Sequence, residues 1–520
     1  MSVIYSLDEL SDEMKKELCK ELTLIPVDPY VEKMKTYGRH KEIQNLPAKI
    51  PLILFKVDKE KRTVKFPFFT IKEKSGVKPN RDREFPRLKK EGLPVFKAEL
   101  RDYQQDAAQE AFLQLKEHAT TTLGFPPGWG KTILGAWLAG KCNGPCLVLV
   151  HRMQIAEAWV KTFQTCFPQY AKSILLVGES DFQQGIKLPN KCKNSENLFK
   201  KDETGKIVSI DSNTFKCGTC KNCKKEDVFV PCFTICMYQR LKNVPEHIKN
   251  AIKVLIIDEA HLFCTHDKIE PILETQPQFI IIETATLNRP DNMHIMMHKF
   301  AGEHCVKREP TKPFRLYKVL TGIKFETVQG KRGIDFNLFT QELINNDNRN
   351  QIVLNLILKN LHRKCIILTR QKGHVTLLKD LLVENDIECD TLFGSKKTYN
   401  DSHVLIGTIP KMGVGFDESN SARLYKGRES DLLILLTSIA QIELFQQVIG
   451  RVMRSKDPAI LYLIDDMSIS KRHYKNVEET IYNSKGLIFE IDIEDEDADL
   501  FIPDCEYNKK GECVVVKNRN

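Results

Sequence analysis

The chain has 520 residues, of which 42% are hydrophobic and 28% charged, as in a globular protein large enough for several domains. Its 78 Lys and Arg residues exceed its 69 Asp and Glu residues, and the net charge of +9 permits a polyanionic partner without requiring one. The sequence has no apolar run of membrane-spanning length and its first residues do not resemble a signal peptide, so we expect an intracellular protein with reduced cysteines.

Residues 1–97 are predicted to form an N-terminal accessory domain. Strands are expected at 50–55 and 63–70, where β-branched and aromatic residues are dense. Lysines between these stretches lie close to Phe66 and Phe68, a mixture that suits either nucleic-acid binding or a hairpin with one buried aromatic face. The second interpretation is the more common one, and 81–90 is expected to be a linker.

A helix is predicted at 100–115 because apolar residues recur there with helical spacing. The next segment reads as strand, loop and helix, with Phe-Pro-Pro-Gly-Trp-Gly-Lys-Thr as the loop, from Phe125 to Thr132. Glycines at 128 and 130 allow a tight turn whose N–H groups bind phosphate, with Lys131 reaching the β- and γ-phosphates and Thr132 holding Mg²⁺. The alternative is a glycine-rich turn with an exposed lysine.

Apolar strands then alternate with helices in two series. The first lobe, 98–310, has expected strands at 146–150, 233–237, 254–257 and 279–282 and a helix at 154–163. The second lobe, 311–480, has a helix from about 348 to 361 and strands at 365–369, 403–407, 432–437 and 459–464. Continuous apolar strands between helices indicate parallel sheets covered on both faces, so the fold class is α/β with two tandem doubly wound lobes. Residues 481–520 are expected to be a surface appendage.

The segment Val254–His261 places two adjacent carboxylates directly after four apolar residues. At the carboxyl edge of a parallel sheet, Asp258 would hold Mg²⁺ opposite Thr132, and Glu259 would deprotonate the attacking water. Capping of the following helix is the alternative explanation.

An insert is predicted at about 181–231, since this segment is too long for an ordinary loop. It contains Cys192, Cys217, Cys220 and Cys223, whose two overlapping Cys-x-x-Cys steps suit tetrahedral Zn²⁺. Free thiols or a redox pair are the alternatives, and Cys232 and Cys236 compete for the fourth ligand position.

Asp258-Glu259-Ala260-His261 is the sequence that names the DEAH-box proteins, and the core resembles a superfamily-two helicase with RecA-like lobes. Further motifs match in order: 100–104, 150–152 with Trp159, 284–286, 407–417 and 447–454. The sixth motif, Gln-x-Ile-Gly-Arg-x-x-Arg, is most similar to XPB-like and phage-repair translocases and to the poxvirus-type transcript-release helicases of large nucleocytoplasmic DNA viruses. Trp129 in the phosphate loop also suits this viral group.

The resemblance implies ATP-driven movement on DNA, in transcript release or repair, with a location in a viral factory or virion and the transcription machinery as a partner. It implies the following residue roles. Catalysis would use Lys131, Asp258, Glu259, Arg451 and Arg454. ATP and Mg²⁺ would be held by Gln104, Pro127, Gly128, Trp129, Gly130, Lys131, Thr132, Asp258, Gly415 and Asp417. Coupling would involve His261, Thr284, Thr286 and Gln447, and nucleic-acid contact Arg152, Thr408 and Gly413.

The two arginines are three residues apart on a predicted helix, so both would lie on one face and act as arginine fingers from the second lobe. Salt bridges on a surface helix are the alternative. At the level of the whole protein, an RNA helicase and a catalytically weak, ATP-switched nucleic-acid-binding adaptor remain the other interpretations.

Overall fold

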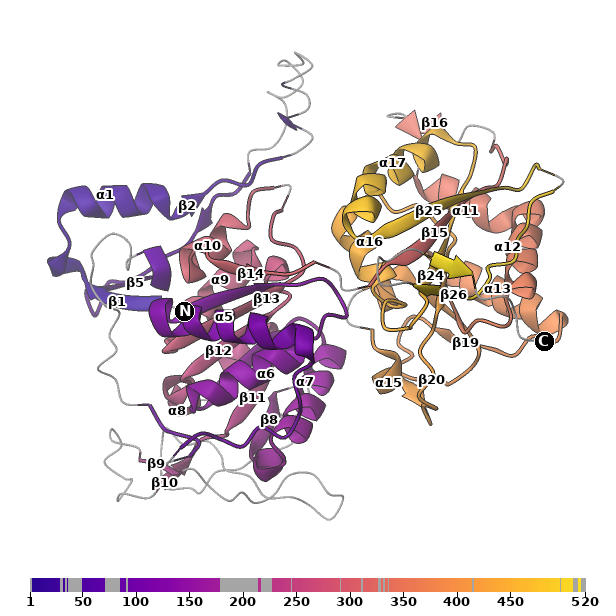
Figure 1. Ribbon diagram of the computed structural model, residues 1–520. Helices are drawn as coiled ribbons and strands as arrows, with labels where there is room; N and C mark the ends of the chain where they lie inside the picture. The colour runs from indigo at the N-terminus through magenta and orange to yellow at the C-terminus, as the bar shows by residue number, and fades with distance from the viewer. Residues whose placement is uncertain are drawn as a thin grey trace. The chain divides into compact units, whose positions relative to one another are not determined.

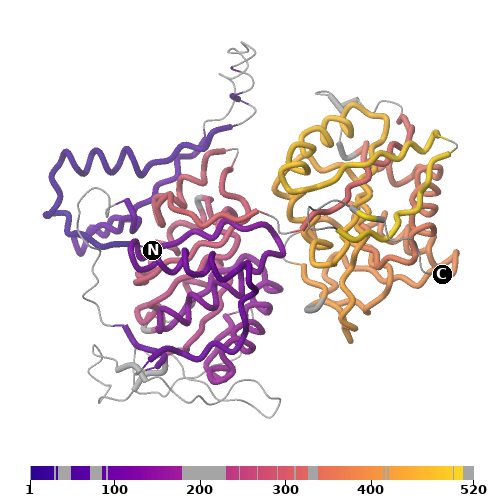
Figure 2. Tube along the Cα trace, in the orientation of Figure 1, coloured from indigo at the N-terminus to yellow at the C-terminus, as the bar shows by residue number. Residues whose placement is uncertain are grey.

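The structure is a computed structural model of the chain (Figure 1). It describes residues 2–28, 31–32, 35, 49–70, 85–89, 92–177, 214–216, 227–244, 246–289, 291–309, 312–325, 329–330, 333–334, 336–413, 416–495, 497–507 and 513–515. The chain divides into two compact units, Met1–Phe125 with Gly130–Arg308, and Pro126–Trp129 with Glu309–Asn520. Figure 2 follows the trace through each unit, from indigo to rose in the first and from rose through orange to yellow in the second.

The first unit is built on a seven-stranded parallel sheet with the order β14-β6-β13-β12-β7-β11-β8. Its strands are β6 (Thr120–Gly124), β7 (Cys146–Val150), β8 (Ile174–Val177), β11 (Phe233–Met237), β12 (Val254–Asp258), β13 (Phe279–Thr284) and β14 (Cys305–Lys307). The strands expected from the sequence are confirmed, because uninterrupted Val, Ile and Leu runs are stable only when both faces of a sheet are covered.

Helices α5 (Asp102–His118), α6 (Lys131–Cys142) and α7 (Met153–Cys166) connect or flank the first strands of this sheet. Each begins within two residues of its predicted start, and α5 runs three residues further than predicted because Ala119, in the left-handed conformation, forms its C-cap. Shorter helices are α8 (Glu246–Ala251), α9 (His266–Leu273) and α10 (Ile295–Ala301). Because α6 follows the loop after β6 and α7 follows β7, their N-termini lie at the carboxyl edge of the sheet, where ligands bind in this class of fold.

The second unit contains another seven-stranded parallel sheet, with the order β19-β21-β18-β23-β24-β15-β25. Its strands are β15 (Phe314–Leu320), β18 (Cys365–Thr369), β19 (Cys389–Leu392), β21 (Val404–Thr408), β23 (Leu432–Leu435), β24 (Ala459–Ile464) and β25 (Gly486–Asp492). Its longer helices are α11 (Phe336–Asn345), α12 (Asp347–Lys359), α13 (Lys372–Glu384), α16 (Ile442–Ile449) and α17 (Ser468–Asn483). Two such sheets with flanking helices confirm the expected α/β class and the tandem RecA-like lobes.

The C-terminal segment differs from the surface appendage expected for it. Strand β25 pairs in parallel with β15 along its whole length, from Gly486↔Phe314 to Asp492↔Leu320. Further along, Ile502 is fully buried and its N–H donates to the Asn360 side chain at 2.7 Å. The acidic run misled the prediction because the apolar residues that carry the strand lie among and before the charges.

The N-terminal segment contributes β1 (Ser2–Ser6), α1 (Asp12–Glu21), β2 (Thr23–Leu24), β3 (Leu52–Ile53), β4 (Lys56–Asp58) and β5 (Thr63–Pro67). Strands β1, β5 and β4 form an antiparallel sheet, and Phe66 and Phe68 are buried in one apolar cluster with residues of the first unit's parallel sheet. Lys65 is ion-paired with Glu274. The hairpin with a buried aromatic face is therefore the correct alternative, although the strand expected at 50–55 is only two residues long.

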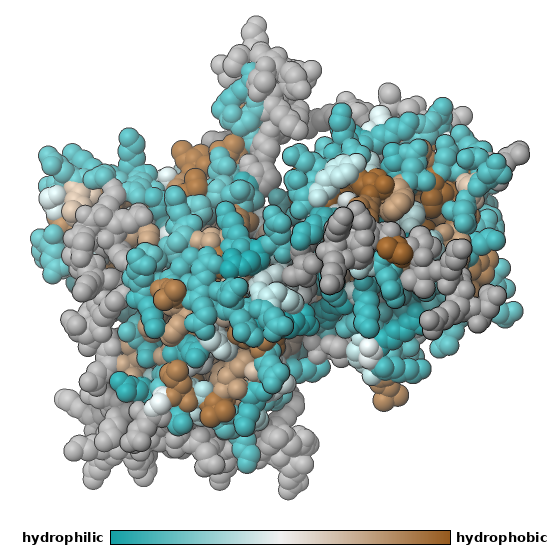
Figure 3. Space-filling model, in the orientation of Figure 1, coloured by the Kyte–Doolittle hydropathy of each residue, from teal (hydrophilic) through white to brown (hydrophobic). Residues whose placement is uncertain are grey.

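The predicted zinc ligands Cys192, Cys217, Cys220 and Cys223 lie outside the described residues, so the zinc site stays a prediction. Within the described ranges, His, Cys, Asp and Glu side chains form no group of three that could hold a metal ion. In the same part of the chain, no helix is long and apolar enough to cross a membrane. The face shown in Figure 3 is mostly hydrophilic, with small separate hydrophobic patches.

Candidate ATP site and coupling residues

The loop between β6 and α6 has the backbone geometry expected of a phosphate loop. Gly128 and Gly130 have φ angles of 79° and 95°, which residues with a Cβ rarely adopt. Gly130 is the N-cap of α6. Pro127 and Trp129 lie in the same turn, and Thr132 lies in the first turn of α6.

Lys131 Nζ donates to the Phe125 carbonyl at 2.9 Å, so the ammonium group lies over the loop itself. A helix N-terminus at the loop and a lysine over it suit a nucleotide phosphate.

Gln104, expected to read the adenine base, is buried at the first turn of α5. Its side-chain carbonyl accepts a hydrogen bond from the Arg101 backbone N–H at 3.0 Å. A Cβ built at Gly130 would overlap the Gln104 amide nitrogen. Gln104 therefore touches the phosphate loop directly, which gives Gly130 a second reason to be glycine.

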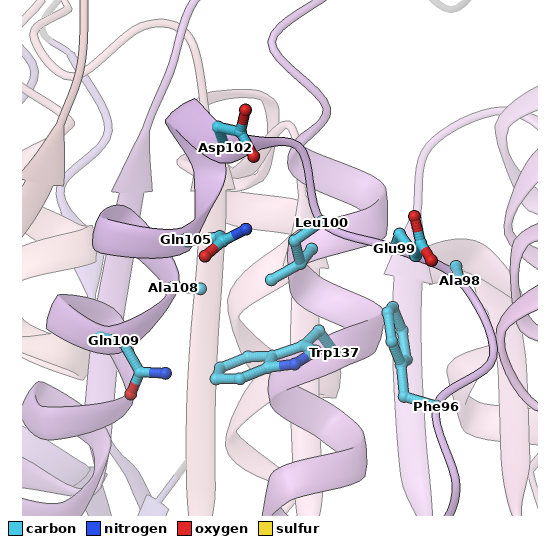
Figure 4. Close-up of a pocket in the computed structure, with 9 residues that line it drawn as sticks. All are labelled: Phe96, Ala98, Glu99, Leu100, Asp102, Gln105, Ala108, Gln109 and Trp137. Carbon is cyan, nitrogen blue, oxygen red and sulfur yellow. The ribbon is translucent and has the colours of Figure 1, made fainter.

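A pocket of about 400 Å³ lies beside this motif (Figure 4). Its lining residues are Phe96, Ala98, Glu99, Leu100, Asp102, Gln105, Ala108, Gln109 and Trp137. The rings of Phe96 and Trp137 lie at its base, with the side chains of α5 on one side. Gln104 is not among the lining residues, so the N-terminal turns of α5 have this pocket on one side and the phosphate loop on the other.

Asp258 ends β12 and is 7% exposed. The Trp159 indole N–H donates to Asp258 Oδ2 at 2.8 Å. Burial raises the pKa of Asp258 to about 6, the charge of Glu259 adds to this rise, and the Trp159 hydrogen bond and Lys131 oppose it. In the sheet order, β6 and β12 are both neighbours of β13, so the ends that carry the phosphate loop and Asp258 are one strand apart.

Glu283 is an acidic residue of this site that sequence reasoning missed. It is paired in register with Asp258 across β12 and β13 and has no exposed surface. Among the described residues, neither of its carboxylate oxygens has a hydrogen-bond partner. A Cβ at Gly135 of α6 would overlap its Oε1. The available signal was Glu283 itself, a charged residue directly after the apolar run Phe279–Ile282, since a buried strand rarely contains a carboxylate.

Burial raises the pKa of Glu283 well above its usual range, and the charge of Asp258 acts in the same direction. The Trp159 N–H stabilises the ionised form of Asp258, whereas neither oxygen of Glu283 has a donor in the described part of the chain. In the metal-free protein, Glu283 is therefore the carboxyl group that is protonated. The folded state then binds more protons than the unfolded state, and stability falls as pH rises above the ordinary Glu range.

Replacing Glu283 with Gln is therefore expected to raise the free energy of unfolding by about 1–3 kcal/mol at pH 8, because no charge has to be buried or neutralised. The gain should shrink toward zero near the ordinary Glu pKa. Urea unfolding at several pH values in EDTA measures it, with the exposed Glu60→Gln as control. A Glu283→Gln gain that is equal at all pH values would contradict this explanation.

Glu259 has a left-handed backbone conformation, with φ 53°, directly after β12. A non-glycine residue in this region costs on the order of 1 kcal/mol and often marks a functional site. Its Oε2 is buried, lies 3.5 Å from His261 Nδ1, and has no hydrogen-bond partner among the described residues. The strained turn directs this carboxylate differently from the preceding Asp258.

The predicted coupling residues of the first unit lie together. His261 Nδ1 is 3.0 Å from Thr284 Oγ1, and the Thr286 N–H donates to the same hydroxyl at 3.0 Å. Arg289 Nη1 donates to the His261 carbonyl at 2.5 Å. The end of β12 is thereby linked by hydrogen bonds to the end of β13.

Arg152, expected at the nucleic-acid backbone, is the N-cap of α7, and partial burial lowers its pKa. The preceding His151 was not singled out in the sequence. Burial lowers the pKa of His151 to about 3, so its ring is neutral at pH 7. Neither ring nitrogen has a hydrogen-bond partner within the described ranges.

In the second unit, Arg451 and Arg454 do not lie on a helix, which corrects the expectation. Helix α16 ends at Ile449, and both arginines lie in the turn that follows its glycine C-cap. Arg451 donates to the carbonyls of Phe416 and, at 2.9 Å, of Gly413. Arg454 is ion-paired with Asp417 at 2.5 Å. Tight i→i−3 turns still bring both guanidinium groups to one segment, 413–417.

The remaining predicted residues of this unit occupy varied positions. Thr408 is buried at the end of β21 and is the N-cap of a short helix, α14 (Ile409–Met412). Gln447 is buried within α16. Gly415 lies outside the described residues. The predicted fifth and sixth motifs therefore meet at Gly413, Phe416 and Asp417.

The region that contains the phosphate loop and the carboxylates, residues 97–289, matches the family "Type III restriction enzyme, res subunit". "Putative helicase 161L" of Invertebrate iridescent virus 6 is 27% identical over 73% of this chain and 80% of its own length. Together these matches support a superfamily-two helicase. A second relative of this helicase, "Putative helicase 055L" of Frog virus 3, is 24% identical over 74% of this chain and 78% of its own length.

Among solved structures, a fragment of a putative HsdR subunit of a type I restriction enzyme from Vibrio vulnificus YJ016 is similar to the helicase. The sequence identity is 13%, and the match covers 81% of this chain and 71% of that one. The TM-score is 0.48. These matches support a helicase-type, ATP-dependent nucleic-acid enzyme, and the helicase family implies ATP and Mg²⁺. The left-handed glycines, Lys131 and the neighbouring carboxylates suit this pair of ligands.

Proposed function

We propose that the protein is an ATP-driven motor that moves along DNA, in viral transcript release or in repair. The observation that carries the proposal is the linked edge of the first sheet. There the buried Asp258 ends β12, the strained Glu259 follows it, and His261 forms a hydrogen bond with Thr284 at the end of β13. A hydrolytic site joined by hydrogen bonds to a neighbouring strand end can pass a change at the phosphates to the rest of the lobe.

In this proposal, Lys131 and the loop N–H groups bind the phosphates, and Thr132 and Asp258 hold Mg²⁺. The metal supplies positive charge that offsets the charge developing on the phosphoryl oxygens. Glu259 orients the attacking water and accepts its proton. Its turn places a second carboxylate beside the metal ligand without making it a ligand, which separates the two roles.

Nucleic acid would be held through its backbone by Arg152, Thr408 and Gly413. Such contacts grip the strand without reading its sequence. Arg451 and Arg454 would supply the second cationic clamp on the phosphates. DNA is favoured by the Gln-x-Ile-Gly-Arg form of the sixth motif, and a viral role by the two viral relatives. The transcription machinery would be the partner in transcript release.

An ATPase assay with single-stranded DNA, duplex DNA and RNA, each at matched nucleotide concentration, tests the proposal. We expect DNA to stimulate turnover at least tenfold more than RNA. Preferential stimulation by RNA would instead support an RNA helicase. Tight ATP binding without turnover on any nucleic acid would support the switched adaptor.

A further inference from the structure

Trp159 of helix α7 forms a hydrogen bond with Asp258, the proposed metal ligand of the ATP site. The side chain lies two turns after Arg152, has no exposed surface, and donates its indole N–H to Asp258 Oδ2 at 2.8 Å. A hydrogen bond to an ionised carboxylate is about twice as strong as one between neutral groups. Because the bond uses Oδ2, the Asp258 carboxylate is held at one of its two oxygens.

The indole ring has little freedom to move. It packs on Phe163 with a centroid distance of 5.4 Å and an interplanar angle of 37°. On its other side, a Cβ built at Gly135 would lie only 3.1 Å from Trp159 Cη2. A ring fixed between α6 and its own helix fixes the direction of its N–H and, through it, the rotamer of Asp258.

The surroundings of Asp258 would otherwise turn its side chain away. The charge of Glu259, the next residue in the chain, repels the Asp258 carboxylate, and the buried Glu283 is its register partner. Two side chains stabilise the ionised form of Asp258, Trp159 through its hydrogen bond and Lys131 through its charge. Lys131 is itself bonded to the Phe125 carbonyl, and the Glu259 backbone also forms a hydrogen bond with Asp258, so Trp159 is the side chain that donates to this carboxylate.

We propose that Trp159 is a positioning residue of the ATP site, whose indole N–H holds the Asp258 carboxylate in the orientation that metal binding requires. The proposal rests on the proposed role of Asp258 as a Mg²⁺ ligand. A buried tryptophan usually finds some acceptor for its N–H. A purely structural Trp159 would therefore affect folding and leave metal binding unchanged.

Trp159→Phe removes the donor and keeps an aromatic ring, and Trp137→Phe is the matched control. Trp137 is the tryptophan of the neighbouring helix α6, and its ring contacts Phe112 and Lys141. In the full-length protein, ATPase activity is measured against Mg²⁺ concentration at saturating ATP. We expect the half-saturating Mg²⁺ concentration to rise about 10- to 100-fold in Trp159→Phe, as for lost partners of metal ligands elsewhere.

The turnover number at saturating Mg²⁺ should change much less than this, and Trp137→Phe should match the wild type in both quantities. Half-saturation within twofold of the wild type in a folded Trp159→Phe protein would overturn the positioning role. Asp258→Asn separates the two proposals: if it keeps Mg²⁺-dependent turnover, the metal role of Asp258 fails, whatever Trp159 does.

A spectroscopic measurement covers the case in which Trp159→Phe does not fold. The chain has three tryptophans, so a ¹⁵N-indole spectrum has three N–H resonances. The Trp159 resonance is the one that neither Trp137→Phe nor Trp129→Phe removes. We expect it to shift in Asp258→Asn and on addition of Mg²⁺ with a non-hydrolysable ATP analogue. An unchanged Trp159 resonance in both experiments would disprove the proposal.

Discussion

Replacing Glu259 with Gln is expected to lower the nucleic-acid-stimulated ATPase turnover by about 10²- to 10⁴-fold, because the amide cannot accept the proton of the attacking water. Its left-handed backbone and the 3.5 Å separation from His261 Nδ1 remain available to Gln, so the turn should be kept. Turnover is measured at saturating ATP with the stimulating nucleic acid. Lys131→Ala should abolish turnover as well, through lost phosphate binding.

The two variants differ in nucleotide affinity, and this separates their roles. Glu259→Gln should bind a fluorescent ATP analogue within about threefold of the wild type, whereas Lys131→Ala should bind it much more weakly. The exposed Glu60→Gln serves as a control for general charge effects. Normal turnover by purified Glu259→Gln protein would remove the proposed base.

Replacing Arg454 with Ala is expected to lower turnover by about 10³- to 10⁵-fold if the residue acts as an arginine finger. Arg454 forms an ion pair with Asp417, and the two side chains are 37% and 22% exposed. An ion pair this accessible contributes about 0–1 kcal/mol to stability, so its loss cannot by itself explain so large an effect. Arg454→Lys should recover little activity, because an ammonium group lacks the planar fork.

Arg451→Ala should reduce turnover too, but with a structural component, since this guanidinium binds the carbonyls of Gly413 and Phe416. Urea unfolding of both variants distinguishes the two contributions. Arg472→Ala, an exposed position on α17, is the matched control. A loss of less than tenfold in Arg454→Ala with unchanged ATP binding would exclude the finger role and leave the ion pair as its function.

Most of the sheet strands could be predicted from sequence because the information is local. Val254–Asp258 and Cys365–Thr369 are continuous apolar runs bounded by polar residues, which indicates a strand covered on both faces. The phosphate loop is equally local, since Gly128 and Gly130 satisfy φ angles that the turn itself requires. Local signals failed at Arg451, where Gly450 ends the helix, and at β25, where charges obscure the apolar residues.

The sequence by itself determined the two α/β lobes, the phosphate loop and the order of the motifs, since each depends on residues adjacent in the chain. Only the tertiary structure decided that Trp159 bonds Asp258, 99 residues away, and that Glu283 lies beside it. The order of the strands in the sheet and the packing of α7 against it set these neighbours. Both bring together residues that are far apart in the sequence. Electrostatics at the metal ligand depends on such neighbours, because a buried carboxylate responds to every charge and donor within a few ångströms.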